Sequence, residues 1–380
     1  MIGVSLLGCT GSIGQSALSV LDRHRDQFRV VALVANRNAA ELAAQCARFR
    51  PDIAALVDPI AGNGSASGWL KGREGLLAAA AHPDADVVLN AVVGAAGLEA
   101  TLTALQSGKR LALANKESLV AGGPLVLDAL ERGGGSLIPV DSEHSAILQC
   151  LRGAQGKEVR RIVLTASGGP FRMHTREQLA QVTCEDALRH PTWDMGAKIS
   201  IDSATLANKA LEVIEAHFLF DLPYDRIDVV VHPQSIVHSM VEFVDGSVLA
   251  QMGFPTMELP ILYALTHPER IEDVGTRTFD PVTAGTLTFE AVDGSRFSAF
   301  RLGVEAGRTG GTAPAVFNAA NEVAVAAFLA GELAFPGIAE VIDVALEAHN
   351  PCIADSLETV LTADAEARAA ARRAIKHAKV

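Results

Sequence analysis

Carboxylates and hydroxyls gather at two places in the chain, and the first is a pair of carboxylates two residues apart. Asp141 and Glu143 flank Ser142, directly after an apolar run at residues 137–140 that predicts a strand. In extended backbone, residues i and i+2 face the same side, so we expect the two carboxylates to converge. Converging carboxylates repel one another unless a proton or a cation lies between them. Oxygen ligands without a nearby thiolate suit a hard divalent ion, Mg²⁺ or Mn²⁺, although such a pair is also common on solvated surfaces.

The second place is a long helix that we expect to begin at Ser203. At about 100° per residue, Asn208, Lys209, Glu212 and Glu215 fall within one wedge of about 120° on this helix. For Glu215, the exposed face of an amphipathic helix is a sufficient explanation. The other three lie beside Ser203 at the expected helix N-terminus, where unpaired N–H groups bind anions. These residues predict a phosphate pocket, with Glu212 as a third carboxylate for the metal.

Two loops offer further groups for that pocket. The turn at residues 165–170 carries Ser167 beside two glycines, so it presents a hydroxyl and bare amides. The loop at residues 190–196 carries Trp193 and His190, and the histidine is placed to donate to a phosphate. A loop tryptophan either packs on the core or acts as a lid that covers the substrate and excludes water.

A glycine loop follows the first predicted strand. Residues 8–14 read GCTGSIG, which has the spacing G-x-x-G-x-x-G in place of the usual G-x-G-x-x-G. Glycines permit a tight turn and close approach of the backbone to a pyrophosphate, and the following helix supplies unpaired N–H groups and a positive dipole end. The position of this loop, after the first strand of a βαβ unit, favours dinucleotide binding over a merely structural turn.

The end of the second predicted strand distinguishes between the two nicotinamide cofactors. An NAD site places Asp or Glu there to hold the ribose 2′-OH. This chain has Asn36, Arg37 and Asn38 and no carboxylate. Arg37 can pair with a 2′-phosphate, and the two asparagines can donate hydrogen bonds. We therefore expect NADPH, with a solvated loop cation as the simpler alternative for Arg37.

Apolar runs and amphipathic stretches alternate over the first third of the chain, which predicts an α/β fold with an N-terminal Rossmann-like parallel sheet. A central α+β region with its own sheet follows, and within it residues 236–244 and 247–252, joined at Asp-Gly, predict a β-hairpin. The expected domains are an NADPH-binding domain at 1–140, a catalytic and metal/substrate-binding domain at 141–275, a linker at 276–294 and a C-terminal helical domain at 295–380.

The composition argues against several classes of protein. The 380 residues carry 32 basic and 44 acidic side chains, and the net charge of −12 argues against general binding of nucleic acid or anionic membranes. The five cysteines form no CxxC pair, which fits a reducing cytoplasm better than a disulfide framework or a thiolate zinc site. No run reaches the roughly 18 apolar residues of a membrane span, and residues 1–7 have no features of a secretory signal.

Taken together, these motifs resemble those of the 1-deoxy-D-xylulose 5-phosphate reductoisomerase family. The motifs that carry the resemblance follow one another along the chain: GCTGSIG at 8–14, ANKESL at 114–119, PVDSEH at 139–144, SGGPF at 167–171, HPTW at 190–193, DSAT at 202–205, HPQS at 232–235 and NAANE at 318–322. Two positions depart from the family pattern. Cys9 stands where relatives often have serine, and Asn36-Arg37 stands where Gly-Lys is expected.

The resemblance implies a homodimeric enzyme that uses NADPH and a divalent metal, with a phosphorylated small molecule as substrate. Such an enzyme rearranges 1-deoxy-D-xylulose 5-phosphate to 2-C-methylerythrose 4-phosphate. It then reduces this aldehyde with NADPH to 2-C-methyl-D-erythritol 4-phosphate, on the non-mevalonate route to isoprenoids.

The resemblance also implies roles for the residues that match the family's motifs. The metal would be held by Asp141, Glu143 and Glu212, and the phosphate end of the substrate by Ser167, His190, Ser203, Asn208 and Lys209. Lys116, Ser142 and Glu143 would meet the other substrate oxygens, with Trp193 as a lid and His238 nearby. NADPH would contact Thr10, Gly11, Ser12, Ile13, Asn36, Arg37, Asn38, Asn115, Glu117 and Gly196.

Two alternatives account for part of the pattern. A simpler NADPH-dependent reductase of a phosphorylated aldehyde or semialdehyde needs the glycine loop but not three metal carboxylates. A non-catalytic NADP-sensing protein also explains the glycine loop, but it gives no reason for the cluster between Ser203 and Glu212.

Overall fold

The computed structural model describes residues 1–58 and 68–378, and contacts divide the chain into two units. Unit 1 comprises Met1–Ser118, Val126–Ser145 and Thr256–Arg277, and unit 2 comprises Leu119–Leu125, Ala146–Pro255 and Thr278–Val380. The domain boundaries expected from the sequence stay a prediction. Among the residues described, none of the helices is both long enough and apolar enough to cross a membrane.

Unit 1 is built on a seven-stranded sheet in which every neighbouring pair is parallel. Its strands are β1 (Ile2–Leu7), β2 (Phe28–Ala35), β3 (Ile53–Leu56), β4 (Leu70–Lys71), β5 (Val87–Asn90), β6 (Arg110–Leu113) and β7 (Ser136–Pro139). In the order β4-β3-β2-β1-β5-β6-β7, successive strands are added on one side of β1 up to β4 and then on its other side from β5 to β7. A dinucleotide-binding fold has the same change of side. The expected Rossmann-like sheet is therefore confirmed.

Helices connect these strands because residues with helical periodicity alternate with the apolar runs. They are α1 (Ser12–Arg23), α2 (Ala39–Phe49), α3 (Gly72–Ala80), the short η1 (Ala95–Gly97), α4 (Leu98–Gln106) and, from a later part of the chain, α11 (Glu258–Thr266). Arg23 at the end of α1 donates to Glu258 and Asp273 at 2.7 and 2.8 Å, so charged contacts tie the returning segment Thr256–Arg277 to unit 1.

Two helices contribute residues to both units. Helix α5 (Lys116–Gly133) begins and ends in unit 1, but Leu119–Leu125 belong to unit 2. Its backbone leaves helical geometry at Gly122, shortly before Pro124. A proline inside a helix is the usual cause of such a kink. Helix α6 (Ser142–Cys150) begins in unit 1 and ends in unit 2.

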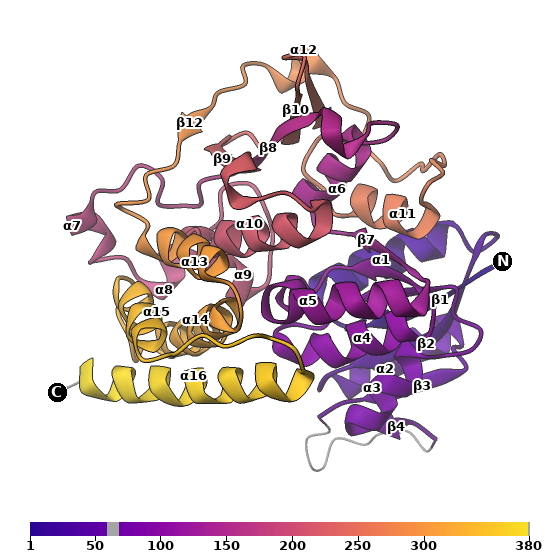
Figure 1. Cartoon of the computed structure of the whole chain (residues 1–380). Helices are drawn as coiled ribbons and strands as arrows, with labels where there is room; N and C mark the ends of the chain where they lie inside the picture. The colour runs from indigo at the N-terminus through magenta and orange to yellow at the C-terminus, as the bar shows by residue number, and fades with distance from the viewer. Residues whose placement is uncertain (59–67, 379–380) are drawn as a thin grey trace. The chain divides into compact units, whose positions relative to one another are not determined.

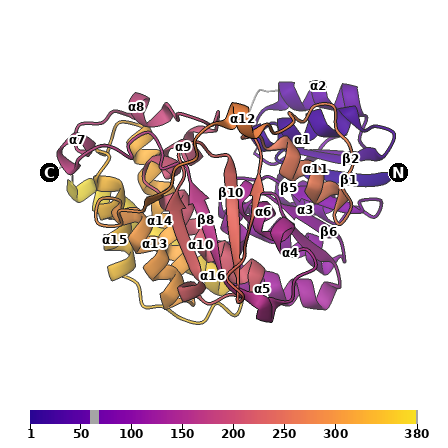
Figure 2. The ribbon, with the colours of Figure 1, turned by 90° about the horizontal axis from the view of Figure 1, so that it is seen from above.

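Unit 2 contains a mixed five-stranded sheet of order β11-β10-β8-β9-β12. Its strands are β8 (Val159–Ala166), β9 (Ile227–Val231), β10 (Val237–Phe243), β11 (Val248–Met252) and β12 (Glu290–Ala291). Strands β10 and β11 form the expected antiparallel hairpin. Figure 2 shows β8 and β10 beside each other, and their buried residues Leu164 and Val241 pack in one apolar cluster with Val213 of a neighbouring helix.

The rest of unit 2 is helical, as expected for the C-terminal part of the chain. The helices are η2 (Gly156–Glu158), α7 (Arg176–Leu179), α8 (Cys184–Leu188), α9 (Ala197–Ala204), α10 (Ala207–Phe220), η3 (Tyr224–Arg226), α12 (Pro281–Ala284), α13 (Ser298–Thr309), α14 (Ala313–Leu329), α15 (Gly337–Glu347) and α16 (Leu357–Ala378). Alanines and larger apolar residues of α10 and α13 to α16 form the main core, around the fully buried Phe317. In Figure 1, α16 runs along α14 and α15.

Candidate active site

The glycine loop of unit 1 joins β1 to α1 in the tight turn that the sequence predicts. Gly8 has φ +86°, and a Cβ there would lie 2.4 Å from Ala91 O. A Cβ on Gly14 would lie 2.3 Å from Gly8 O, so the third glycine allows the helix to pack on the loop. Gly11 caps α1 and its carbonyl accepts the first helical bond, from Gln15 N. The amides before Gln15 therefore have no partner within the helix and can bind an anion.

Cys9 is a buried part of this loop. Its side chain is fully buried, and burial raises the pKa of the thiol to about 12. Gln45 of α2 donates to the Cys9 carbonyl at 3.1 Å, which fixes the backbone of the loop. The departure from serine at this position therefore places a neutral, inert thiol inside the fold.

The residues after β2 are already engaged with protein groups. Arg37 is exposed and its Nε donates to Asp58 Oδ2 at 2.8 Å. Asn38 caps α2, because its Oδ1 accepts from Glu41 N at 3.1 Å. Asn36 is exposed beside them. A 2′-phosphate at this position would therefore share Arg37 with Asp58, and contact of these three residues with NADPH stays a prediction.

Asn115 is the N-cap of helix α5 and is almost fully buried. Its Oδ1 accepts from Ser118 N at 3.0 Å, and its Nδ2 donates to Val92 O and Gly94 O at 2.7 and 2.9 Å and to Glu117. This network holds the start of α5 against the loop after β5. It fixes the orientation of the next residue, Lys116. It also occupies the side chains of Asn115 and Glu117, which were expected to contact NADPH.

Lys116, Asp141 and Glu143 come together in unit 1 at the carboxyl ends of β6 and β7. Lys116 Nζ donates to Asp141 Oδ2 at 2.7 Å, and both side chains are mostly buried. Glu143 N donates to Asp141 Oδ1 at 3.3 Å, and Ser142 Oγ donates to the carboxylate of Glu143. The three residues therefore form one polar cluster that contains two carboxylates and a cation.

The route by which the two carboxylates come together differs from the expectation. We expected extended backbone through Asp141 and Glu143, but β7 ends at Pro139 and α6 begins at Ser142. Asp141 thus lies at the helix start and Glu143 in the first turn, where the positive end of the helix dipole favours carboxylates. His144 was not expected in this cluster, and its Nδ1 lies 3.7 Å from Asp141 Oδ1. The i, i+3 spacing of the two residues at a helix start is the signal that could have found it.

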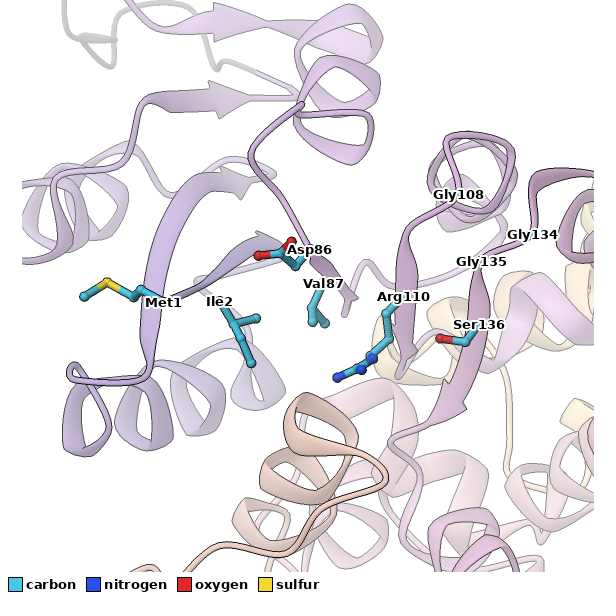
Figure 3. A pocket seen from close by; sticks show the side chains of 9 residues that line it. All are labelled: Met1, Ile2, Asp86, Val87, Gly108, Arg110, Gly134, Gly135 and Ser136. Carbon is cyan, nitrogen blue, oxygen red and sulfur yellow. The ribbon is translucent and has the colours of Figure 1, made fainter.

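A separate cavity of about 530 Å³ opens at the amino ends of the unit 1 strands, opposite to their carboxyl ends. Figure 3 shows that its lining includes the first residues of β1, β5, β6 and β7, which are Ile2, Val87, Arg110 and Ser136. The predicted cofactor and metal residues of unit 1 instead follow the last residues of its strands. In parallel sheets ligands bind at that carboxyl edge, so this cavity is not the candidate cofactor site.

In unit 2, Ser167 and His190 form a hydrogen-bonded pair. Ser167 Oγ and His190 Nε2 are 2.9 Å apart, and His190 Nδ1 accepts from the backbone N–H groups of Thr192 and Trp193 at 3.1 and 2.9 Å. An imidazole that accepts through Nδ1 carries its proton on Nε2, so His190 donates towards Ser167. Burial lowers the pKa of His190, which favours this neutral form.

The loop between α8 and α9 places Trp193 near His238. Their ring centroids are 6.4 Å apart, and His238 lies on β10 with 7% of its surface exposed. Trp193 is only partly buried, so it is not a core residue of unit 2. Gly196 ends the loop as the exposed N-cap of α9. This arrangement suits a lid, and contact of either ring with substrate stays a prediction.

The expected long helix is two helices, and this changes the place of Ser203. Helix α9 (Ala197–Ala204) contains Ser203 in its last turn, and Leu206 in left-handed geometry, with φ 58°, joins it to α10. Ser203 is therefore not at the N-terminus of the helix that carries Lys209. The turn at Gly169 lies close to Ser203 instead, because a Cβ on Gly169 would be 2.7 Å from Ser203 O. Residues 167–169 and Ser203 thus approach one another within unit 2.

The first two turns of α10 bring three predicted residues together. Asn208 Nδ2 and Lys209 Nζ both donate to the carboxylate of Glu212, which is 1% exposed. A buried carboxylate is costly without a cation, so Lys209 stabilises Glu212 in this structure. Glu215 is 3% exposed, and the expectation of a solvated face is wrong: Ala207–Ala216 are buried on nearly every side of the helix. The periodicity of a helix enclosed on all sides does not identify an exposed face.

Comparisons with known proteins agree across almost the whole chain. Three family models match: 1-deoxy-D-xylulose 5-phosphate reductoisomerase at residues 4–123, its C-terminal domain at 137–220, and a DXP reductoisomerase C-terminal domain at 252–370. A 1-deoxy-D-xylulose 5-phosphate reductoisomerase of Ralstonia nicotianae is 52% identical over 97% of this chain and 96% of its own length. One of Bacillus cereus strain Q1 is 50% identical over 97% of this chain and 98% of its own.

Two solved structures are similar over the whole fold. The reductoisomerase of Zymomonas mobilis, in complex with NADPH, has a TM-score of 0.90 and 45% identity, over 98% of this chain and 99% of that one. A DOX-P reductoisomerase in complex with NADPH, fosmidomycin and magnesium has a TM-score of 0.94 and 39% identity, over 100% of this chain and 99% of that one.

Proposed function

Because the chain belongs to the 1-deoxy-D-xylulose 5-phosphate reductoisomerase family, we propose that its own residues carry out the NADPH- and metal-dependent conversion of 1-deoxy-D-xylulose 5-phosphate to 2-C-methyl-D-erythritol 4-phosphate. The observation that carries this proposal is the cluster of Lys116, Asp141 and Glu143 at the carboxyl edge of the same sheet that bears the glycine loop. Residues suited to NADPH binding and residues suited to metal binding therefore lie at the same edge of one sheet.

Asp141, Glu143 and Glu212 would hold the divalent cation. Their chemistry fits, since carboxylate oxygens are the ligands that Mg²⁺ and Mn²⁺ prefer. The relative in complex with magnesium supports the choice of this metal. When bound, the cation supplies a Lewis acid that polarises the carbonyl and hydroxyl oxygens of the substrate. Lys116 lies beside Asp141 and would donate to the same oxygens, which lowers the cost of negative charge there.

Residues of unit 2 would hold the phosphate and exclude water. Ser167, Ser203, Asn208 and Lys209 supply hydroxyl, amide and ammonium donors, and His190 supplies a neutral Nε2–H. Binding energy from the phosphate, remote from the reacting carbons, can be used to orient the substrate. Trp193 would cover the substrate, because water must be kept from the aldehyde formed by rearrangement.

The cofactor would lie along the glycine loop. The amides before Gln15 would bind the pyrophosphate, and Arg37 would bind the 2′-phosphate of NADPH in competition with Asp58. When bound, NADPH supplies the hydride for the reduction. The relative in complex with NADPH supports the choice of this cofactor.

The test is incubation of the purified protein with 1-deoxy-D-xylulose 5-phosphate, NADPH and Mg²⁺. Stoichiometric NADPH oxidation with formation of the branched product, followed by absorbance at 340 nm and by NMR, supports the proposal. Oxidation of NADPH without a branched product would instead indicate a simple reductase, and binding of NADPH with no turnover would indicate a sensing protein.

We also propose a homodimer that pairs through β11. This strand bonds only to β10 within the described sheet, so its other edge is open, and Val248 and Leu249 are about half exposed. An open edge with apolar side chains favours pairing with a second copy. Light scattering should give twice the chain mass. Replacement of Leu249 by lysine should shift the protein to monomers, and an unchanged dimer would place the interface elsewhere.

The cytoplasm is the proposed location. None of the five cysteines forms a disulfide in the described part of the chain, and two of them are buried, which supports a reducing compartment. Cell fractionation with a tagged chain tests this, and recovery from the membrane or an extracellular fraction would contradict it.

A further inference from the structure

A buried polar network in unit 2 lies outside the set of residues proposed above to contact substrate, metal or cofactor. Asn321 of α14 donates from Nδ2 to Asp202 Oδ1 of α9 at 2.8 Å, and Lys198 Nζ lies 2.7 Å from Asp202 Oδ2. Asn321 is fully buried and Asp202 is 1% exposed. The two residues belong to the motifs DSAT and NAANE, and the resemblance to the family implies no role for either of them.

Stability alone does not account for an asparagine at position 321. Its Oδ1 is buried and has no hydrogen-bond partner among the described residues. Burying such an acceptor costs about 1–3 kcal/mol. The alternative orientation of the amide would bring Oδ1 against the carboxylate of Asp202, so the single bond from Nδ2 fixes the side chain. The fold tolerates a cost at this position in exchange for a defined contact with α9.

The contact with Asp202 determines how α9 is turned about its axis. Asp202 and Ser203 are consecutive, so their side chains point about 100° apart. When Asp202 faces α14, Ser203 faces a different side of α9, and its backbone carbonyl lies against Gly169 in the turn that carries Ser167. Thr205 then carries this orientation to α10, because its hydroxyl bonds to Ile201 O and accepts from Ala207 N.

We propose that Asn321 is a positioning residue: through Asp202 it fixes the rotation of α9, so that Ser203 and the start of α10 present their donors to the substrate phosphate. This inference rests on the assignment of Ser203, Asn208 and Lys209 to the phosphate. Asn321 itself touches no substrate in this account. Its effect is transmitted over one hydrogen bond and one turn of helix.

The test compares Asn321→Leu with Asn318→Leu. Asn318 is a close match, since it lies one turn away on α14, is fully buried, and also has an Oδ1 without a partner among the described residues. Its Nδ2 donates to Glu322 and not to α9. A merely structural role predicts the same behaviour in both variants, namely a change in melting temperature and unchanged ligand affinity.

The readout is binding of fosmidomycin, a phosphonate, to the full-length protein with NADPH and Mg²⁺, measured by calorimetry. We expect Asn321→Leu to weaken this binding and to raise the KM for substrate about 10- to 100-fold, since small displacements of positioned groups have effects of this size. The Kd for NADPH should stay unchanged in both variants, and Asn318→Leu should bind fosmidomycin as the wild type does.

Equal fosmidomycin affinity in Asn321→Leu and Asn318→Leu overturns the inference. If Asn321→Leu does not fold, Asn321→Ala is measured instead, with Asn318→Ala as its control, because the smaller side chain also removes the bond to Asp202. A folded Asn321→Ala with wild-type fosmidomycin affinity likewise overturns it. A wild-type protein that neither binds fosmidomycin nor turns over the substrate would contradict the proposed function itself, which is a separate outcome.

Discussion

The glycine loop of unit 1 and the predicted phosphate residues of unit 2 differ in the kind of group that each would offer to an anion. In the glycine loop the groups available to an anion are backbone amides. Gly8 and Gly14 are needed there because a Cβ would collide with Ala91 O and Gly8 O, respectively. In unit 2 the donors are side chains of Ser167, His190 and Lys209, carried by separate elements. Substitutions should therefore act by steric collision in unit 1 and by loss of charge or donors in unit 2.

The sharpest test of this contrast is Glu212→Gln. The change keeps the shape of the side chain but removes the charge that pairs with Lys209 and that would hold the proposed cation. We expect turnover to fall about 1,000-fold or more, since a Lewis-acid metal contributes several kcal/mol to catalysis. The Kd for NADPH, measured by fluorescence titration, should stay within about twofold because Glu212 is not among the residues proposed to contact the cofactor.

Glu305→Gln on α13 is the control for Glu212→Gln. Glu305 is exposed and pairs with Arg301, and its loss should leave turnover unchanged. Wild-type activity in Glu212→Gln would remove Glu212 from the metal site.

The next largest effect should come from Gly14→Val. The new side chain would begin 2.3 Å from Gly8 O and 2.6 Å from the Cα of Cys9, so the loop must open. We expect NADPH binding to weaken about 100-fold, as the loop amides lose their shared direction. Gly156→Ala is the control, because a Cβ there meets nothing within 4 Å. Unchanged NADPH affinity in a folded Gly14→Val would mean that the loop does not hold the cofactor.

The same contrast explains which parts the sequence could predict. The parallel sheet and the glycine loop follow from local patterns, since alternating apolar and amphipathic segments and spaced glycines each determine their own backbone. The break between α9 and α10 could not be predicted this way, because Leu206 in left-handed geometry carries no turn signal such as Gly or Asn. The burial of Glu215 and the bond from Asn321 to Asp202 also escaped prediction, since both depend on helices that pack from distant parts of the chain.

Arg37→Glu should have an intermediate and selective effect. Arg37 carries the positive charge beside the predicted 2′-phosphate, so its reversal should reduce the preference for NADPH over NADH about tenfold or more. Asp58→Asn should act in the opposite direction and tighten NADPH slightly, because it releases Arg37 from its ion pair. The two Kd values for each variant give the answer. Equal weakening of NADPH and NADH in Arg37→Glu would show that Arg37 does not bind the 2′-phosphate.

The smallest effect concerns His190 and pH. Burial lowers the pKa of His190 below its usual 6.5, so the folded protein takes up this proton less readily than the unfolded chain does. The linkage therefore reduces stability as pH falls below about 6.5, and the loss levels off once pH is below the lowered pKa. Protonation would also force Nδ1 to give up the N–H bonds from Thr192 and Trp193, which hold the loop between α8 and α9.

Melting curves of wild type and His190→Gln between pH 5 and 7.5 measure this effect. The wild type should lose more stability on acidification than His190→Gln, whose amide does not titrate in this range. His349→Gln serves as a comparison, because burial also lowers the pKa of His349, but that residue bonds to Thr312 and lies far along the chain from the loop between α8 and α9. If fosmidomycin binding weakens with acidification in the wild type and in His349→Gln but not in His190→Gln, the neutral imidazole of His190 is the form that serves unit 2. If the pH dependence of fosmidomycin binding is the same in His190→Gln as in the wild type, the imidazole does not contribute to anion binding in unit 2. Anion binding there would then depend on the backbone, as it does in the glycine loop, and the proposed difference between the two regions would be wrong.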